Sequence, residues 1–126
     1  MLGSEQLGAF VATTDVDAAR AFYRDTLGLR LVDDNPFALV FDANGTTLRV
    51  TRVEDAVVAP YTVLGWDVTD VVATVAALTA RGVAFHRYEG MEQDDAGIWS
   101  APGGARVAWF ADPEGNTLSV SQGPTA

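Results

Sequence analysis

The amino-acid sequence predicts an α+β fold made of two tandem βαβββ modules. A β-hairpin pattern occurs twice, the pattern of a capped amphipathic helix precedes each hairpin, and an apolar strand-like run precedes each helix. Strand and helix periodicities therefore follow one another in the same order in both halves. A chain of 126 residues has the size of one domain. We expect a single domain over residues 1–126, with module one at residues 5–55 and module two at residues 60–122.

The hairpins give the clearest signal of this duplication. In residues 105–122, two runs rich in β-branched and aromatic residues flank a turn at residues 112–116 that contains Pro, Gly and Asn. The same pattern surrounds Asn44-Gly45, where the turn is one residue shorter. Since the two registers coincide after the turn glycine, we expect Arg49 and Ser119 to occupy equivalent positions.

Each predicted helix has a recognisable start and end. Asp15 and Asp70 can each cap the first free amides, and Gly28 and Gly82 suit a left-handed residue after the last turn. The apolar stripes that we expect to face the core are Val16, Ala19, Phe22 and Tyr23 in the first helix, and Val72, Val75, Ala76 and Thr79 in the second.

Strands are predicted on both sides of each helix, at residues 7–13 and 30–32 in module one and at residues 61–68 and 83–88 in module two. The first of these is apolar throughout, so both of its faces should be covered. A long loop at residues 89–104 replaces the short turn of module one. Its acidic part, residues 89–95, is either a solvated surface or the rim of a pocket or hard-cation site.

Composition excludes several classes of function. The chain has no cysteine, a net charge of −9, and arginine at all eight basic positions. Disulfides, thiol nucleophiles and lysine Schiff bases are therefore excluded, and nucleic acid and anionic membranes should be repelled. With no apolar run near about 20 residues, we expect a soluble cytoplasmic protein. The acidity either favours a cationic ligand or only keeps the surface solvated.

The duplicated module, the stretch from Asp15 through Phe22-Tyr23 to Leu27-Gly28, and the turn at residues 110–116 resemble the vicinal oxygen chelate superfamily. That group includes glyoxalase I, extradiol dioxygenases, epimerases and the bleomycin resistance proteins. The resemblance spans essentially the whole chain. It implies a curved mixed sheet around a ligand-binding cleft, and a homodimer.

The resemblance also implies where a metal would be held, namely at Gly8, Arg49, Val63 and Ser119. Glycine and valine offer no donor atom, arginine is a permanent cation, and a lone serine hydroxyl is a poor ligand for a divalent ion. His86 is the chain's one histidine. We therefore expect no metal and no other cofactor. For His86, ordinary hydrogen bonding and acid–base chemistry both remain open.

Strand alternation predicts which side chains line the cleft. Arg49 would either meet a ligand anion or carbonyl, or form a structural pair with Asp67 or another acid. Thr47, Gly65, Thr117, Ser121 and Val107 should face the same way, whereas Trp66, Phe22 and Tyr23 should belong to the core. The predicted ligand-binding residues are Phe10, Arg49, Thr51, Tyr61, Val63, Asp67, Trp99, Trp109 and Ser119.

These residues favour a metal-free small-molecule binding protein that sequesters a drug or metabolite. One alternative is a metal-independent lyase or isomerase, acting on a small carbonyl or carboxylate substrate through Arg49, Asp67, His86 or Tyr61. Another is an interaction module whose cleft is filled by its own side chains. No catalytic residue is assigned, and the protein is expected to bind its ligand rather than to turn it over.

Overall fold

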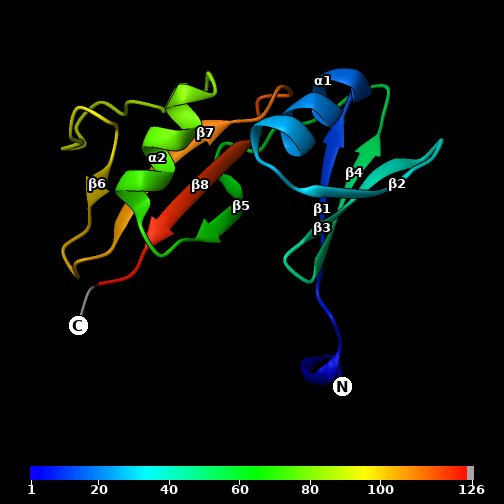
Figure 1. Ribbon diagram of the computed structural model, residues 1–126, viewed down its shortest axis with the longest axis horizontal. Coiled ribbons are helices and arrows are strands. Elements are labelled where there is room, and N and C mark those ends of the chain that lie inside the picture. The colour runs from blue at the N-terminus through cyan, green and yellow to red at the C-terminus, as the bar shows by residue number, and fades with distance from the viewer. Residues whose placement is uncertain (125–126) are drawn as a thin grey trace. The chain divides into compact units, whose positions relative to one another are not determined.

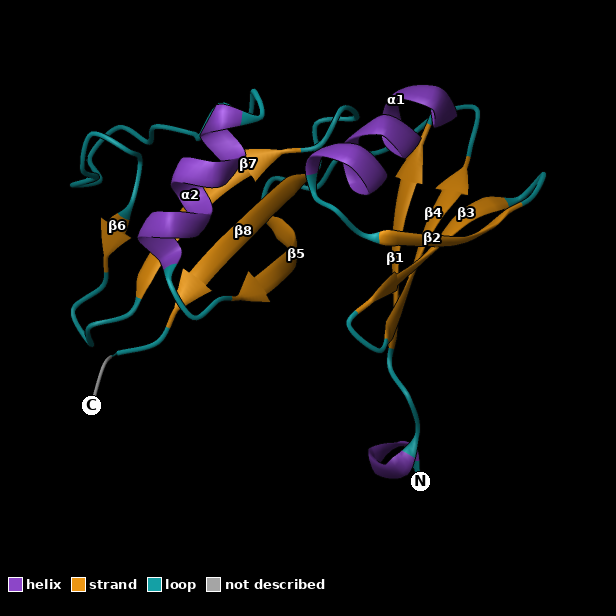
Figure 2. Ribbon diagram, viewed as in Figure 1, coloured by secondary structure: helices purple, strands orange, loops and turns teal. Residues whose placement is uncertain are grey.

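The computed structural model describes residues 1–124. The chain divides into two compact units, the first spanning residues 1–58 and the second beginning at Ala59. Each unit contains one four-stranded mixed sheet with a helix on one face (Figures 1 and 2). The strand orders, β1-β4-β3-β2 in sheet A and β5-β8-β7-β6 in sheet B, are the same. The predicted duplication and the α+β fold class are thus confirmed.

In the first unit, β1 runs parallel to β4 and the other neighbours are antiparallel. The Asp15 carboxylate accepts a hydrogen bond from the Ala18 amide at 3.1 Å, as expected of an N-cap. The helix continues as a π-helix, in which the Leu27 amide donates to the Phe22 carbonyl at 2.9 Å. The elements are η1 (Leu2–Ser4), β1 (Gly8–Thr13), α1 (Val16–Arg20), η2 (Ala21–Thr26), β2 (Arg30–Asp34), β3 (Ala38–Ala43) and β4 (Thr46–Arg52).

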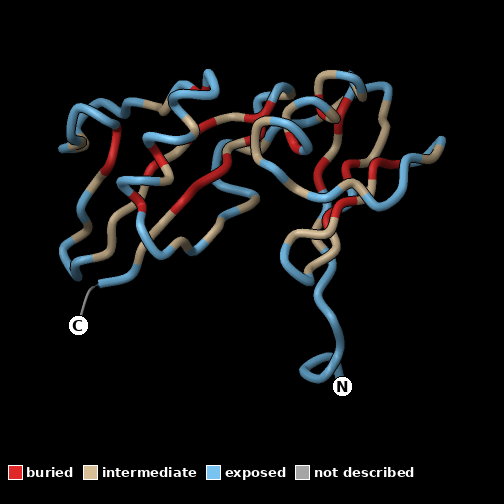
Figure 3. The backbone as a smooth tube through the Cα atoms, viewed as in Figure 1, coloured by how far each residue is buried: buried red, intermediate tan, exposed pale blue. Residues whose placement is uncertain are grey.

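The core of the first unit lies between this helix and sheet A. Tyr23 is fully buried, and its ring centroid lies 5.9 Å from that of Phe41. Val11 is buried on the same side, but Phe10 is 63% exposed. Figure 3 shows the buried stretches of the chain in red. The expectation that both faces of strand one are covered is wrong within this unit, because the helix covers only the Val11 face.

The second unit repeats this arrangement around a longer helix. Asp70 caps α2 by accepting from the Ala73 amide at 3.0 Å, and Gly82 follows its last turn with φ +95°. The helix lies against β7 and β8 (Figure 1), over the buried Phe110 and Leu118. The elements are β5 (Thr62–Asp67), α2 (Val71–Ala80), β6 (Trp99–Ser100), β7 (Arg106–Ala111) and β8 (Thr117–Gln122).

The buried face of α2 differs from the predicted stripe. Val71 and Val75 are buried, whereas Val72 is 52% exposed and Ala76 and Thr79 are also exposed. The helix contains no charged residue. Its sequence therefore gives no polar face from which the orientation could be read, and the predicted phase was wrong by about one position.

The predicted strand at residues 83–88 is also wrong. This segment makes one ladder-like bond to β7, from the His86 amide to the Trp109 carbonyl at 2.7 Å, but it forms no strand. The short strand β6, which lies inside the predicted loop, pairs with the start of β7 instead. Two segments therefore share the edge of β7. Among the described residues, no helix is long and apolar enough to cross a membrane.

Candidate ligand-binding site

The face of sheet A that the helix leaves open carries three of the predicted ligand-binding residues. Phe10 on β1 pairs in register with Arg49 on β4. The Arg49 guanidinium carbon lies 5.8 Å from the centroid of the Phe10 ring, a cation–π arrangement that holds both side chains at the surface. Thr51 follows two residues along β4, on the same face and half-buried. This face therefore presents a cation, an aromatic ring and a hydroxyl.

The open face of sheet B is built around a row of three paired residues. Ser119 on β8 is in register with Gly65 on β5 and with Trp109 on β7. A Cβ atom on Gly65 would lie 2.8 Å from the Ser119 Oγ, so the absence of a side chain there leaves room above the hydroxyl. Ser119 is only 9% exposed. The row thus places a recessed hydroxyl beside the Trp109 indole.

The next row adds a carboxylate to this face. Asp67 on β5 and Val107 on β7 both pair with Ser121 on β8. The Ser121 hydroxyl donates to Asp67 Oδ1 at 3.1 Å, and Asp67 is exposed. The carboxylate is thereby held in place while its other oxygen stays open to a ligand.

Aromatic rings stand along one side of the Trp109 indole. The Trp99 ring lies 6.0 Å from it, tilted by 35°, and the Tyr88 ring lies 5.5 Å from it, edge on at 83°. His86 Nδ1 lies 3.2 Å from the Tyr88 hydroxyl, and these two rings also meet edge to face. The chain thereby assembles a continuous aromatic surface of the kind that stacks on flat ligands.

Sequence reasoning missed Tyr88 as part of this surface, although a signal was present. Phe85 packs on Phe110 at 5.4 Å, on the side of sheet B that faces α2. Alternation along an extended segment then turns His86 and Tyr88 to the opposite side, where Trp109 lies.

The structure does not bring Tyr61 into either surface. Tyr61 precedes β5 and is 67% exposed. The alternation that placed it beside Val63 fails, because the ladder is irregular between Thr62 and Leu64. Val63 lies within that irregularity and is 37% exposed.

The register confirms that Arg49 and Ser119 are equivalent, since each pairs with a parallel first strand and an antiparallel third strand of its own unit.

The donor chemistry at the four positions where the family resemblance would place a metal, Gly8, Arg49, Val63 and Ser119, does not fit a divalent ion. Arg49 Nη1 stands 3.8 Å from where a Gly8 Cβ would be, so a cation occupies the place of a ligand. Among residues 1–124, no group of three or more His, Cys, Asp or Glu side chains is placed so that it could hold a metal ion.

In the acidic loop, the Asp94 side chain holds the loop backbone. Its Oδ1 accepts from the Ala96 and Ile98 amides, both at 2.9 Å. The loop also surrounds a hollow of about 740 Å³, which is lined by residues 90–94 and 98–100 and reaches Trp99. The hollow therefore adjoins the aromatic surface of the second unit.

Comparison with known proteins gives one family model and many similar folds. The model of the Glyoxalase/Bleomycin resistance protein/Dioxygenase superfamily matches residues 6–120. A search by sequence among curated proteins finds no significant match. Solved structures of similar fold cover nearly the whole chain.

TnmS3, an antibiotic binding protein from Streptomyces sp. CB03234, is 26% identical with a TM-score of 0.70, and the match covers 98% of both chains. A superfamily member from Sphaerobacter thermophilus DSM 20745 is 23% identical with a TM-score of 0.73, over 97% of this chain and 99% of that one. A lactoylglutathione lyase from Agrobacterium tumefaciens is 21% identical with a TM-score of 0.73, over 95% of this chain and 94% of that one.

Proposed function

Since this chain belongs to the Glyoxalase/Bleomycin resistance protein/Dioxygenase superfamily, we propose that it is a binding protein that sequesters a flat, partly polar small molecule without using a metal. The observation that carries the proposal is the row of Trp109, Ser119 and Gly65 on the open face of sheet B. An indole stands there beside a hydroxyl, with room left above the hydroxyl.

Ring stacking supplies the first part of the proposed recognition. A planar ligand placed on Trp109 also meets Trp99 or Tyr88, because both rings lie within 6.0 Å of the indole. Each aromatic pair adds about 0.5–1.5 kcal/mol beyond the area it buries. Stacking of this kind tolerates different ring systems, so it favours a class of ligands over one compound.

Polar groups supply the second part. The Ser119 hydroxyl suits a ligand carbonyl or hydroxyl, and the Asp67 carboxylate suits a ligand amine. The net charge of −9 raises the local concentration of cationic ligands further. A planar molecule with a basic group and a carbonyl or phenol edge therefore fits these residues best.

One of the fold neighbours supports this proposal. TnmS3 is described as an antibiotic binding protein, and binding is the class of function proposed here. Its 26% identity extends over 98% of this chain. We extend its class of function, and not its particular ligand, to this protein.

The proposal is tested by ligand-dependent stabilisation. The probes are planar quinones, aromatic polyketides and cationic glycopeptides, added at about 100 times their dissociation constants, where binding raises the free energy of unfolding by about 2.7 kcal/mol. Trp109→Ala should abolish this gain. Trp66→Phe is the matched control, because Trp66 alternates to the other face of β5. If no probe stabilises the wild type, or if Trp109→Ala responds like the wild type, the proposal is wrong.

The proposal includes a cytoplasmic homodimer, which the family resemblance supports. Light scattering after gel filtration checks this part, because a dimer has twice the 13.3 kDa mass of the chain. A mass of one chain at all micromolar concentrations would contradict it. The ligand measurement above does not depend on that result.

A further inference from the structure

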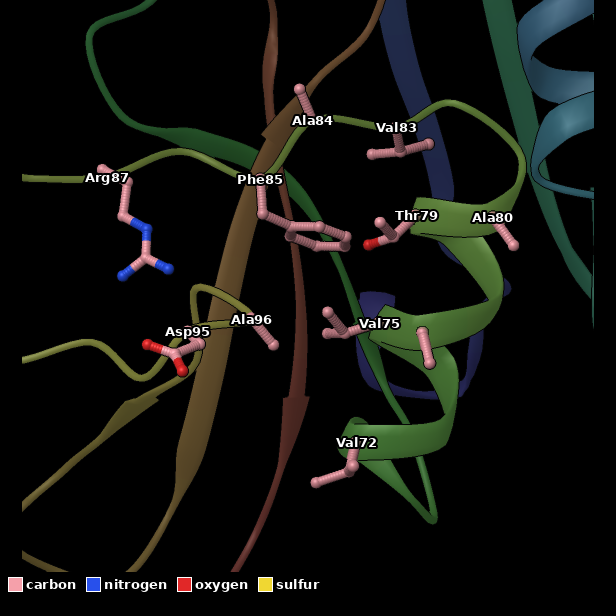
Figure 4. A pocket seen from close by; sticks show the side chains of 11 residues that line it. Val72, Val75, Thr79, Ala80, Val83, Ala84, Phe85, Arg87, Asp95 and Ala96 are labelled. Atoms are coloured by element: carbon pink, nitrogen blue, oxygen red, sulfur yellow. The ribbon is translucent and has the colours of Figure 1, made fainter.

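The second unit contains a separate hollow on the opposite face of sheet B, beside α2 (Figure 4). It has a volume of about 630 Å³, which lies within the range of small-molecule sites. The exposed residues of α2 form one wall, and Arg87 of the segment after the helix and Asp95 of the long loop stand on the opposite side. The main lining residues are Val72, Ala76, Thr79, Phe85, Arg87 and Asp95.

The composition of α2 is that of a helix covered on both sides, although one side faces the hollow. All ten residues of the helix are uncharged, yet it buries only one side against sheet B. A helix that is apolar all round is normally enclosed. Val72, at 52% exposure, is the largest uncovered side chain on it.

Phe85 and Ala96 form the floor between these two sides of the hollow. Figure 4 shows the Phe85 ring directed toward Thr79 and Val75, with the Ala96 methyl group below it. Phe85 is half-buried and its other side packs on Phe110 at 5.4 Å, so the ring is fixed from beneath. An apolar group entering the hollow meets a preformed surface.

The end of the hollow away from α2 carries one charge of each sign. Arg87 and Asp95 lie on the same side in Figure 4, across Phe85 and Ala96 from the helix. Arg87 Nη1 donates to the Gln93 carbonyl at 3.3 Å, which leaves most of its donors for other partners. In the described part of the chain, Arg87 and Asp95 are not joined by an ion pair of 4.0 Å or less. Both charges therefore remain open to a ligand.

We propose that this hollow binds a free apolar α-amino acid. An α-carboxylate would meet Arg87, an α-ammonium would meet Asp95, and a branched or aromatic side chain would lie on Phe85 between the two sides. A simple carboxylate would face Asp95 and the net charge of −9, and a simple amine would face Arg87. A zwitterion matches both charges and, being neutral overall, is not repelled by the protein.

This site is independent of the proposed function. Trp109 and Phe110 are neighbours on β7 whose side chains point to opposite faces of sheet B, and the hollow lies on the Phe110 side. Loss of the aromatic ligand and loss of the amino acid can therefore be separated by two different substitutions.

The test is a titration of the isotope-labelled full chain with L-leucine and L-phenylalanine, followed by amide NMR shifts. Saturable shifts are expected at residues 72–80 and 85–96. Glycine lacks the apolar side chain, N-acetyl-L-leucine lacks the ammonium and L-leucinamide lacks the carboxylate. N-acetyl-L-leucine and L-leucinamide should each bind at least about tenfold more weakly, the factor that corresponds to one lost charge-assisted contact of about 1.4 kcal/mol. Glycine should also bind at least about tenfold more weakly, because it keeps both charges but buries no apolar side chain on Phe85.

Variants locate the site. Arg87→Gln and Asp95→Asn should each weaken L-leucine binding at least about tenfold, whereas the control Arg81→Gln, outside the hollow, and Trp109→Ala, on the other face, should leave it unchanged. The double variant that combines Arg87→Asp with Asp95→Arg should bind L-leucine more tightly than either of these two substitutions alone, because it again offers one charge of each sign. The proposal is overturned if neither amino acid gives saturable shifts, if N-acetyl-L-leucine binds as well as L-leucine, or if Arg87→Gln has no effect.

Discussion

Gly65 and Ser119 face each other across β5 and β8 so closely that a Cβ on Gly65 would lie 2.8 Å from the Ser119 Oγ. Real side chains do not approach within that distance, so Gly65→Ala must displace the hydroxyl. The displaced serine would leave a favoured rotamer at a cost of about 0.5–1.5 kcal/mol. The open space above the Ser119 hydroxyl, here called the notch, therefore depends on both Gly65 and Ser119.

A double-mutant cycle measures that contact. Gly65→Ala should be more destabilising by about 0.5–1.5 kcal/mol in the wild type than in Ser119→Ala, where no hydroxyl is displaced. Urea unfolding of the four proteins at 25 °C gives the coupling energy. A coupling of zero would mean that the hydroxyl rotates away without cost and that the notch is not restricted.

The turn between β7 and β8 depends on Asp112, which is buried. Its Oδ1 accepts from the amides of Glu114 and Asn116 at 3.0 and 2.9 Å, and its Oδ2 accepts from Asn116 Nδ2 at 2.9 Å. Asp112→Ala would remove the acceptor for all three donors. We expect a loss of about 2–3 kcal/mol in the free energy of unfolding.

Asp42 of the first hairpin, which like Asp112 stands three residues before its turn glycine, serves as the control. Asp42 accepts from the Gly45 amide at 2.8 Å and from Arg30 Nη2 at 3.0 Å, and both contacts are exposed, so water can replace the carboxylate. Asp42→Ala should therefore destabilise the protein less than Asp112→Ala in the same urea experiment. Equal losses would show that burial of the second turn does not matter.

The predictions from sequence succeeded where local chemistry is decisive. Asp15 and Asp70 cap their helices as expected, and both hairpins form. Their signals are contained in a few neighbouring residues, so they depend little on distant contacts. The open face of sheet B followed from the same alternation, which is why Trp109 and Ser119 could be placed on one face in advance.

The errors arose where the outcome depends on distant partners. A uniformly apolar α2 can turn either Val71 or Val72 toward the sheet, and only the packing against β7 and β8 decides between them. The segment at residues 83–88 has the composition of a strand, but β6 takes part of the edge of β7 that the segment would need. Competition for one strand edge leaves no local signature in the sequence.

The negative charge of Asp42 makes a pH-dependent contribution to the stability of the folded protein. The hydrogen bond from Arg30, at 3.0 Å, together with the Gly45 amide, lowers the pKa of Asp42 below its ordinary value of 3.8. A carboxylate whose folded pKa is lowered stabilises the protein above its unfolded pKa, and this contribution is lost as pH falls through the folded value.

Arg30→Gln should therefore raise the pKa of Asp42 toward 3.8. The stability difference between this variant and the wild type should be present above about pH 4 and should shrink as acid is added. NMR titration of the Asp42 carboxyl carbon measures the pKa, and urea unfolding at several pH values measures the difference. An unchanged pKa would mean that Arg30 is not the main cause of the shift.

The Gln93 side chain holds together the segment that fails to form a strand. Its Oε1 accepts from the Tyr88 amide at 2.8 Å, and its Nε2 donates to the carbonyls of His86 and Gly97 at 2.8 and 2.9 Å. One amide group thus replaces the ladder that a neighbouring strand would have supplied. Because Tyr88 stands against Trp109, this clip also positions the aromatic surface.

Gln93→Leu keeps the size of the side chain and removes all three hydrogen bonds, so it should cost about 1–3 kcal/mol. Hydrogen exchange of the Tyr88 amide should accelerate well before that of the Val120 amide in the core strand β8. Gln93→Glu separates the contributions, since it keeps the acceptor for Tyr88 but turns a carboxylate toward two carbonyls. Its Tyr88 amide should exchange at an intermediate rate. If Tyr88 is equally protected in Gln93→Leu and the wild type, the segment is held by its contacts with β7 and not by Gln93.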